Sequence, residues 1–278
     1  MENRIPKRII HLWGQGEHSL SLLSKASIAN TKLINPDYEF IFFDNNRMEA
    51  FTEEHFPEYR ELLHSFRLPI QRYDFFRYLA IYHFGGFYLD LDIFLASGLD
   101  NLLKFDCVFT FEELTLNMFL RQRYGIDWEI ANYAFGAVAR HPFVRAIIEN
   151  CVKAHDDPKW VNPMMKSIPL IFRENFYAFY TSGPGLVTRT LAEHREFAEQ
   201  VIVLFPENVC DLTNWHRFGE FGVHLQQGTW IKRKGLFRRK LLRLWISWTR
   251  AKLLKKSMML GPKRAWNAAR DDESPLAS

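Results

Sequence analysis

The segment Phe87-Tyr88-Leu89-Asp90-Leu91-Asp92-Ile93-Phe94 carries two carboxylates one residue apart in a run of aromatic and aliphatic residues. Such a run is typical of a buried strand. Strand side chains alternate between two faces, so Asp90 and Asp92 are predicted to point to the same side. Two neighbouring carboxylates repel each other and lose hydration on burial, so a positive charge must compensate them. Hard oxygen ligands suit Mg²⁺ or Mn²⁺, and such an ion most often holds a diphosphate.

A second group of polar residues precedes this segment. Asp74, Arg77 and Tyr78 are spaced i, i+3 and i+4 in a helix expected over residues 69–83, so they share a face. The aspartate can accept hydrogen bonds from hydroxyls, and the arginine can contact phosphate or carboxylate. The alternative is an intrahelical ion pair, which contributes little stability.

A third candidate is His224, in the segment Gly222-Val223-His224-Leu225. A histidine in an extended segment can complete a metal shell begun by Asp92. A lone histidine is more often a core or surface residue, so this interpretation depends on the rest of the pattern. Trp230, six residues later, is most simply a core residue.

The chain that must position these groups has 278 residues, 47% of them apolar, with 25 Phe, 10 Tyr and 8 Trp. These values indicate one large globular domain, or a domain with an appendage. Cys107, Cys151 and Cys210 form no C-x-x-C pair, which favours buried thiols in a reducing compartment. The first residues do not resemble a signal peptide, and no run of 18 apolar residues predicts a membrane-spanning helix.

Apolar patterning predicts strands that alternate with helices, and therefore an α/β sandwich with a mostly parallel sheet. Strands are expected at 8–13, 38–43, 87–94, 106–111, 133–139 and 201–205, with a short extended segment at 222–225. Helices are expected at 19–33, 47–64 with a break near Pro57, 69–83, 142–154, 159–179 and 186–193.

Together these motifs resemble glycosyltransferase family 32, the sugar transferases with a D-x-D signature. They include bacterial capsule and O-antigen enzymes and eukaryotic α-mannosyltransferases. The motifs are I-P-K-R-I-I-H-L-W at 5–13, D-F-F-R-Y at 74–78, G-G-F-Y-L-D-L-D at 85–92, S-G-P-G at 182–185 and H-x5-W at 224–230. A bare D-x-D triplet carries little information, but this run with D-x-x-R upstream is specific. The resemblance covers about residues 5–230.

The resemblance implies a single Rossmann-like nucleotide-diphospho-sugar transferase domain, expected over residues 1–230. The composition of residues 231–278 predicts a basic amphipathic helical tail after it. It implies a hexosyltransferase that takes a UDP- or GDP-linked sugar, holds Mn²⁺ or Mg²⁺, and typically retains the anomeric configuration. The expected acceptor is a glycan or a lipid-linked glycan, in capsule or lipopolysaccharide synthesis.

The resemblance also assigns roles to single residues. Asp92, His224 and Asp90 are expected at the metal, with Asp90 near the donor sugar or ribose, and Asp74 and Arg77 at the sugar or phosphates. Catalysis is expected to depend on Asp90, Asp92 and Arg77. Trp13 matches a position that lines the base pocket in relatives, although a core tryptophan at a strand end is about as frequent. The donor-binding set is Trp13, Asp74, Arg77, Tyr78, Asp90, Asn132, Thr229 and Trp230.

Sugar transfer passes through an oxocarbenium-like transition state, so the leaving diphosphate needs positive charge beside it. An inverting enzyme also needs a carboxylate base, for which Glu112, Glu113 and Asp127 are the candidates. Surface charge is the commoner explanation for such residues, so the base stays unassigned.

The C-terminal region is strongly basic. Residues 221–270 hold 14 Lys and Arg and no Asp or Glu, which leaves 22 basic residues against 32 acidic ones elsewhere. On a helical wheel, one apolar stripe contains Leu241, Leu244, Trp245 and Trp248, and the opposite basic face contains Arg239, Lys240, Arg243 and Arg250.

This pattern favours a helix on an anionic membrane, peripheral on the inner face of the plasma membrane in the cytoplasm. The alternatives are a helix packed on the body with its basic side in water, and nucleic-acid binding, against which the acidic body argues. The rival functions are a metal-dependent phosphoesterase and a non-catalytic carbohydrate- or membrane-binding module.

Overall fold

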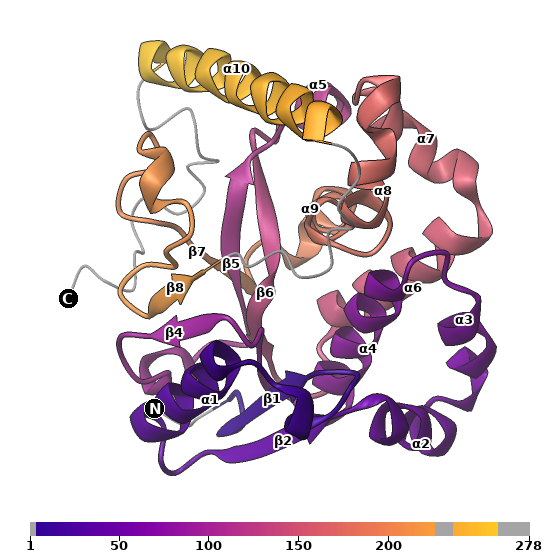
Figure 1. Cartoon of the computed structure of the whole chain (residues 1–278), viewed down its shortest axis with the longest axis vertical. Coiled ribbons are helices and arrows are strands. Elements are labelled where there is room, and N and C mark those ends of the chain that lie inside the picture. Colours follow the sequence, from indigo (N-terminus) through magenta and orange to yellow (C-terminus); the bar gives the residue numbers. More distant parts are fainter. Residues whose placement is uncertain (1–3, 226–235, 261–278) are drawn as a thin grey trace.

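The computed structural model describes residues 4–225 and 236–260, and its centre is a six-stranded sheet in the order β2-β1-β3-β6-β5-β7 (Figure 1). Five strands run in the same direction and β6 runs against them. The predicted α/β class with a mostly parallel sheet is therefore confirmed. The strands are β1 Arg8–Leu12, β2 Glu39–Phe43, β3 Gly86–Leu89, β5 Cys107–Leu114, β6 Trp128–Ala137 and β7 Val201–Leu204. A second, two-stranded sheet pairs β4 Ile93–Leu95 with β8 Gly222–His224.

Helices cover the sheet, with α4 and α6 packed together and α1 beside β4 (Figure 1). Short 3-10 turns join some of these elements, among them η4 Leu170–Phe172, which leads into α8. The α-helices are α1 Leu22–Ile34, α2 Asn45–His55, α3 Arg60–Ser65, α4 Pro69–Phe84, α5 Met118–Tyr124, α6 Pro142–Asp156, α7 Pro158–Lys166, α8 Arg173–Thr181, α9 Pro184–Glu193 and α10 Leu236–Leu260.

The site depends on α4, which is buried on all sides from Asp74 to Ile81. Pro69 occupies its first turn, where a missing N–H costs nothing, and the backbone N–H of Leu68 donates to Oε1 of Gln71 at 2.9 Å. The helix ends at Gly85, with φ of 64°, and Gly86 follows with φ of 97°. Both values favour glycine, so the two glycines turn the chain from the helix into β3.

The prediction of one continuous strand over residues 87–94 is wrong, because two strands joined by a turn occupy this segment. β3 ends at Leu89 and β4 begins at Ile93, and the intervening turn has the N–H of Ile93 donating to the carbonyl of Asp90 at 3.2 Å. The cause is tertiary, because β3 pairs with β1 and β6 whereas β4 pairs with β8 in the other sheet. Asp90 and Asp92 therefore lie in a turn between two sheets, not on one face of a strand.

Prolines explain where the predicted helices divide. The break near Pro57 is confirmed, since a 3-10 turn at Pro57–Tyr59 separates α2 from α3. The helix predicted over 159–179 is two helices, because Pro169 lies between α7 and the turn η4 that leads into α8. Sequence patterning missed α5 and began β6 five residues too late. Cys107, Cys151 and Cys210 are free thiols, and the first two are buried.

Helix α10 packs on the body of the protein, across the upper edge of the view in Figure 1. The Trp245 ring lies 5.5 Å from Phe172 and 6.0 Å from Phe176, centroid to centroid. Arg250 forms an ion pair with Glu113 of β5 and lies over the ring of Trp215. Trp245 and Arg250 thus face the body, which corrects the predicted apolar stripe and basic face.

The other residues of the predicted stripe and basic face are either exposed to solvent or outside the described part of the structure. Leu241, Leu244 and Trp248 are exposed, as are Lys240 and Arg243, while the side chain of Arg239 lies outside the described residues. Within the described part of the chain, no helix combines the length and apolar character needed to cross a bilayer. The division of the chain into 1–230 and 231–278 stays a prediction.

A Gly86→Ala substitution is expected to destabilise the fold by about 2–4 kcal/mol, because it adds backbone strain and places Cβ 2.6 Å from the carbonyl oxygen of Arg8. Gly125→Ala is the matched control, since Gly125 also has positive φ, of 71°, but nothing lies within 4 Å of its Cβ position. Thermal unfolding should show a much larger fall in Tm for Gly86→Ala. Equal falls in Tm would mean that the close approach of Arg8 in β1 to position 86 does not destabilise the variant.

Candidate active site

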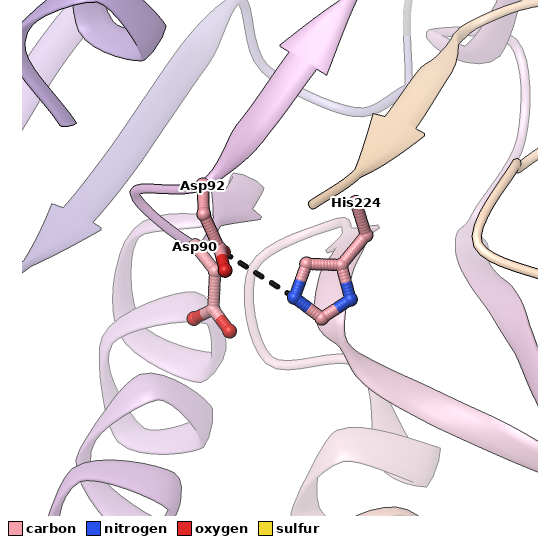
Figure 2. Close-up of side chains that lie close together, drawn as sticks. All are labelled: Asp90, Asp92 and His224. Atoms are coloured by element: carbon pink, nitrogen blue, oxygen red, sulfur yellow. Dashed lines mark ion pairs between the residues drawn. The ribbon is translucent and has the colours of Figure 1, made fainter. Parts of the chain in front are cut away.

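Asp90, Asp92 and His224 converge at the turn between β3 and β4, as Figure 2 shows. Each offers one ligand atom, and these atoms lie within 4.8 Å of one another. Nε2 of His224 lies 3.3 Å from Oδ1 of Asp92, and both side chains are about 15% exposed. The structure thus brings together the three residues that the sequence predicted at the metal, although His224 follows Asp92 by 132 positions in the sequence.

Backbone pairing holds His224 in place. Ile93 is opposite His224 in the β4–β8 ladder, and the N–H of Leu225 donates to the carbonyl of Asp92 at 3.0 Å. The Tyr133 ring covers the imidazole with ring centroids 4.1 Å apart. These contacts fix the imidazole beside the carboxylates before any ligand arrives.

The charges around His224 favour its protonated form. Burial disfavours the imidazolium, but the hydrogen bond to Asp92 and the negative charges of Asp92, Asp90 and Glu112 outweigh that cost and raise its pKa. In the protein as described, a proton on His224 therefore compensates part of the negative charge of the turn.

Arg77 is the second centre of the site. Its guanidinium lies 3.1 Å from Asp74 and 3.3 Å from Asp90, donates to the carbonyl of Asn132 at 2.8 Å, and lies over the ring of Tyr88. The side chain is only 5% exposed. The predicted intrahelical ion pair with Asp74 exists, but the same guanidinium also reaches Asp90 of the turn. The hydroxyl of Tyr88 donates to the same Asp90 oxygen at 2.6 Å.

Asp74 accepts hydrogen bonds from two other parts of the fold. Asn132 of β6 donates to Oδ1 at 3.0 Å, and Ser182, in the loop after α8, donates to Oδ2 at 2.8 Å. Tyr78 accepts a hydrogen bond from the same amide of Asn132 and donates to the carbonyl of Ser182. Burial raises the pKa of Asp74, although Arg77, Ser182 and Asn132 oppose the rise. The predicted residues Asp74, Tyr78 and Asn132 thus form one buried network with Arg77.

Trp13 directly follows β1, the parallel neighbour of β3, so it lies at the same edge of the sheet as Asp90. Ligands of open α/β sheets bind at this carboxyl edge. The Trp13 ring is only partly buried, and its Nε1–H donates to Ser19 at 2.8 Å. It is therefore not a core tryptophan, and its contact with a nucleotide base stays a prediction. Thr229 and Trp230 lie outside the described residues.

The three carboxylates proposed as a base differ in their surroundings. Glu113 pairs with Arg250, and Asp127 pairs with Arg121 at 2.9 Å. Glu112 is the extra residue of a bulge in β5, because Phe111 is opposite Ile130 and Glu113 is opposite Glu129. Burial, aided by the charges of Glu113 and Asp90, raises the pKa of Glu112 to about 7. Bulges often direct side chains toward active sites. Of the three carboxylates, Glu112 is therefore the one whose surroundings suit a catalytic base.

The cluster fits a small divalent cation in donor chemistry and nearly in size. Oxygen donors from two carboxylates suit Mg²⁺ or Mn²⁺, and imidazole is a frequent additional ligand of transition metals. Two ligand atoms bound to one such ion at about 2.1 Å lie at most about 4.2 Å apart. The ligand atoms lie within 4.8 Å of one another, which is close to this limit, so small side-chain rotations would be enough for all three groups to hold one ion.

Sequence reasoning missed Ser182, Tyr88 and Tyr133 as members of the site. Ser182 belongs to the S-G-P-G motif, which indicates that the residue is important. The motif does not reveal its hydrogen-bond partner, because Asp74 is 108 positions away in the sequence. Tyr88 is part of G-G-F-Y-L-D-L-D and orients Asp90. Nothing in the sequence around Tyr133 signals its contact with His224, because that contact arises only when β6 and β8 fold together.

Residues 24–109, which include Asp74, Arg77, Asp90 and Asp92, match the protein family described as "Glycosyltransferase sugar-binding region containing DXD motif". Mannosyl phosphorylinositol ceramide synthase CSH1 of Saccharomyces cerevisiae is 30% identical over 48% of this chain and 31% of that protein. Uncharacterized glycosyltransferase L373 of Acanthamoeba polyphaga mimivirus is 28% identical over 65% of this chain and 68% of that protein. The chain thus spans less than a third of the yeast relative's length.

A solved structure, the UDP-bound glycosyltransferase domain from the YGT toxin, matches 73% of this chain and 80% of that one, at 10% identity and a TM-score of 0.47. The sequence matches alone confirm the predicted resemblance. The roles of the single site residues in the reaction stay predictions.

Binding of Mn²⁺ is expected to weaken as the pH falls from 8 to 6, because His224 must lose its proton to act as a ligand and its pKa is raised above 6.5. Below that pKa, affinity should fall about tenfold per pH unit. Calorimetric titration with Mn²⁺ at several pH values measures the effect. His224→Gln should bind weakly at every pH in this range, with His18→Gln, at an exposed position, as the control. An unchanged pH dependence in His224→Gln would exclude it as a ligand.

A second expectation concerns Glu112, whose pKa of about 7 in the folded protein exceeds the usual 4.5. Between these two pH values the folded protein holds the proton more tightly, so the free energy of unfolding falls as the pH rises through this range. Glu112→Gln removes this loss, and its stability relative to wild type should improve by about 1–3 kcal/mol between pH 4.5 and 7. Thermal unfolding tests this, with the exposed Glu61→Gln as control; a pH-independent difference would contradict the raised pKa.

Proposed function

We propose that this chain, which matches the DXD glycosyltransferase family over residues 24–109 and resembles family 32, moves a hexose from a nucleoside-diphosphate sugar to a glycan or lipid-linked acceptor. The observation that carries the proposal is the convergence of Asp90, Asp92 and His224 beside Arg77. The two carboxylates suit a divalent ion, and the guanidinium suits an anionic group of the donor. A diphosphate leaving group needs positive charge beside it, and a site for a divalent ion and a buried arginine lie together at one edge of the sheet.

Asp92, His224 and Asp90 would hold Mn²⁺ or Mg²⁺, which when bound neutralises charge on the leaving diphosphate. Arg77 keeps its charge while buried and faces the turn, so it stabilises negative charge that develops on the leaving group. Asp74 is oriented by Ser182 and Asn132 and accepts hydrogen bonds from donor hydroxyls. Trp13 lies at the same edge and offers an aromatic surface to a base linked through UDP or GDP.

The relatives guide the choice of sugar and acceptor. The yeast protein is named as a synthase of mannosyl phosphorylinositol ceramide, a product in which a hexose is joined to a phosphorylated lipid. The family resemblance also includes bacterial enzymes of capsule and lipopolysaccharide synthesis, whose acceptors are lipid-linked. The proposal therefore includes a lipid-linked acceptor, and attachment of the basic tail to the inner face of the plasma membrane from the cytoplasm.

Retention of the anomeric configuration belongs to the same proposal. Two of the three carboxylates available to an inverting enzyme as a base are held in ion pairs, Glu113 with Arg250 and Asp127 with Arg121. Glu112 remains near the site with a raised pKa. Product stereochemistry, read by NMR of the newly formed linkage, decides between retention and inversion.

Asp92→Asn is expected to reduce release of nucleoside diphosphate from the donor by at least about 100-fold, because it removes a negatively charged ligand without changing side-chain size. The assay incubates the protein with UDP- and GDP-hexoses and Mn²⁺, and a thermal-shift screen of the same donors first selects the one that binds. Asp37→Asn, at an exposed position away from the site, is the matched control.

Three outcomes are informative. Loss of release in Asp92→Asn with an unchanged Tm supports the metal role, and full activity in that variant contradicts it. No release from any donor with wild-type protein favours the non-catalytic binding module. Release of inorganic phosphate from phosphomonoesters instead of sugar transfer favours the phosphoesterase.

A further inference from the structure

The outward face of α10 combines large apolar side chains with cations. Leu241 is 37% exposed, Leu244 58% and Trp248 59%, although each is large enough to add to the core. Exposed residues near them along the helix include Lys240, Arg243, Lys252 and Lys255, and residues 240–255 contain no Asp or Glu. The ammonium of Lys252 lies 3.4 Å from the centre of the Trp248 ring.

The opposite face of the same helix is fully used by the protein. Trp245, Leu253 and their neighbours pack against the core, and Arg250 pairs with Glu113. The exposed apolar residues therefore belong to a helix that is already packed on the protein. They form a second apolar face on a helix whose first face is already buried.

A second element exposes apolar residues next to this face. In the turn η4, Leu170 is 76% exposed and Ile171 is 57% exposed, while the adjacent Phe172 is buried against Trp245. Trp245 is one helical turn from Leu241 and from Trp248, so η4 is fixed to the middle of α10. The contact between Phe172 and Trp245 thus places the turn beside α10.

We propose that Leu170 and Ile171 of η4, together with Leu241, Leu244 and Trp248 of α10, form a single docking surface for an anionic lipid bilayer. This inference deepens the membrane attachment proposed above, and it places part of the contact on the body of the protein, outside the basic tail. Leucine and isoleucine enter the acyl boundary, tryptophan lies at the headgroup level, and Lys240, Arg243, Lys252 and Lys255 contact lipid phosphates.

Charge complementarity favours a membrane over other partners. The surface offers cations without acidic residues, which an anionic headgroup layer matches. A nucleic acid would match the charge but leave the exposed leucine and isoleucine side chains without apolar contact. An anionic lipid surface matches the cations and also provides apolar contact for these side chains.

The rigidity of the attachment has a consequence for the acceptor. Because α10 is joined to β5 through Arg250 and Glu113 and to η4 through Trp245, the docking surface is fixed relative to the catalytic sheet. A bilayer bound there holds the site at one orientation to the membrane, as a lipid-linked acceptor requires. A flexible tether would impose no orientation.

Co-sedimentation of the full chain with vesicles tests the proposal, using phosphatidylcholine alone and phosphatidylcholine with 30% phosphatidylglycerol (about one anionic lipid in three). Two double variants are compared, Leu170→Ser with Ile171→Ser and Leu244→Ser with Trp248→Ser. The control is Leu22→Ser with Leu33→Ser, since these α1 leucines are 86% and 81% exposed but belong to another face. All changes are at exposed positions, and unchanged Tm values verify folding.

Wild type and control are expected to bind anionic vesicles, and each docking variant to lose about tenfold or more in partition coefficient. Higher salt should weaken wild-type binding, and neutral vesicles should bind less. If the Leu170/Ile171 variant binds like wild type, the turn is not part of the surface and the proposal fails. Equal binding of wild type to neutral vesicles, or no binding to either kind, also overturns it.

Donor hydrolysis without vesicles separates this proposal from the proposed function. The docking variants should keep wild-type release of nucleoside diphosphate from a soluble donor, since none of the altered residues lies at the site. Absence of hydrolysis in every protein, with vesicle binding retained, refutes the enzyme and leaves the docking surface standing. A wild-type oligomer that the Leu244/Trp248 variant dissociates, without any vesicle binding, assigns the surface to a second copy of the chain instead.

Discussion

The buried guanidinium of Arg77 is the interaction on which the site depends. A charge that is 5% exposed persists in a protein interior only with compensating partners, and Arg77 has carboxylates on two sides, Asp74 in its own helix and Asp90 in the turn. The carboxylates depend equally on the arginine, because burial alone raises the pKa of Asp74. The ion-pair network therefore fixes α4 against the D-x-D turn. It also explains why the D-x-x-R and D-x-D motifs occur together.

The balance of charge around the turn is negative without a ligand. Asp90, Asp92 and Glu112 face Arg77 and His224, and the pKa of both His224 and Glu112 is raised, so each tends to hold a proton. Burial is the main cause for Glu112, with the charges of Glu113 and Asp90 adding to it, whereas for His224 the neighbouring negative charges outweigh the effect of burial. A divalent cation held by Asp92, His224 and Asp90 would supply the same compensation and would displace the proton of His224. Metal binding at this position would then be linked to proton release.

The chemistry of the site could be predicted from the sequence better than its local structure. The pair Asp90 and Asp92 was identified from carboxylate spacing, yet the residues lie in a turn, because strand propensity does not reveal that the chain changes sheets after Leu89. His224 was selected by motif, and its contact with Asp92 exists only through the β4–β8 ladder. The helical wheel of α10 placed Trp245 with the exposed apolar residues and Arg250 with the exposed basic ones, and only tertiary packing shows that these two side chains contact the body.

Strand β5 connects the two functional regions of the molecule through neighbouring glutamates. Glu113 receives Arg250 from α10, while Glu112, the bulge residue beside it, shares the electrostatic environment of His224 and Asp90. A regular strand has no extra residue at this point, and the bulge frees Glu112 from the ladder while Glu113 keeps its pairing opposite Glu129. The β-bulge is thus the local feature that lets one segment fix the outer helix and also carry a carboxyl group to the site. For this reason the position of α10 and the geometry of the site depend on the same few residues of β5.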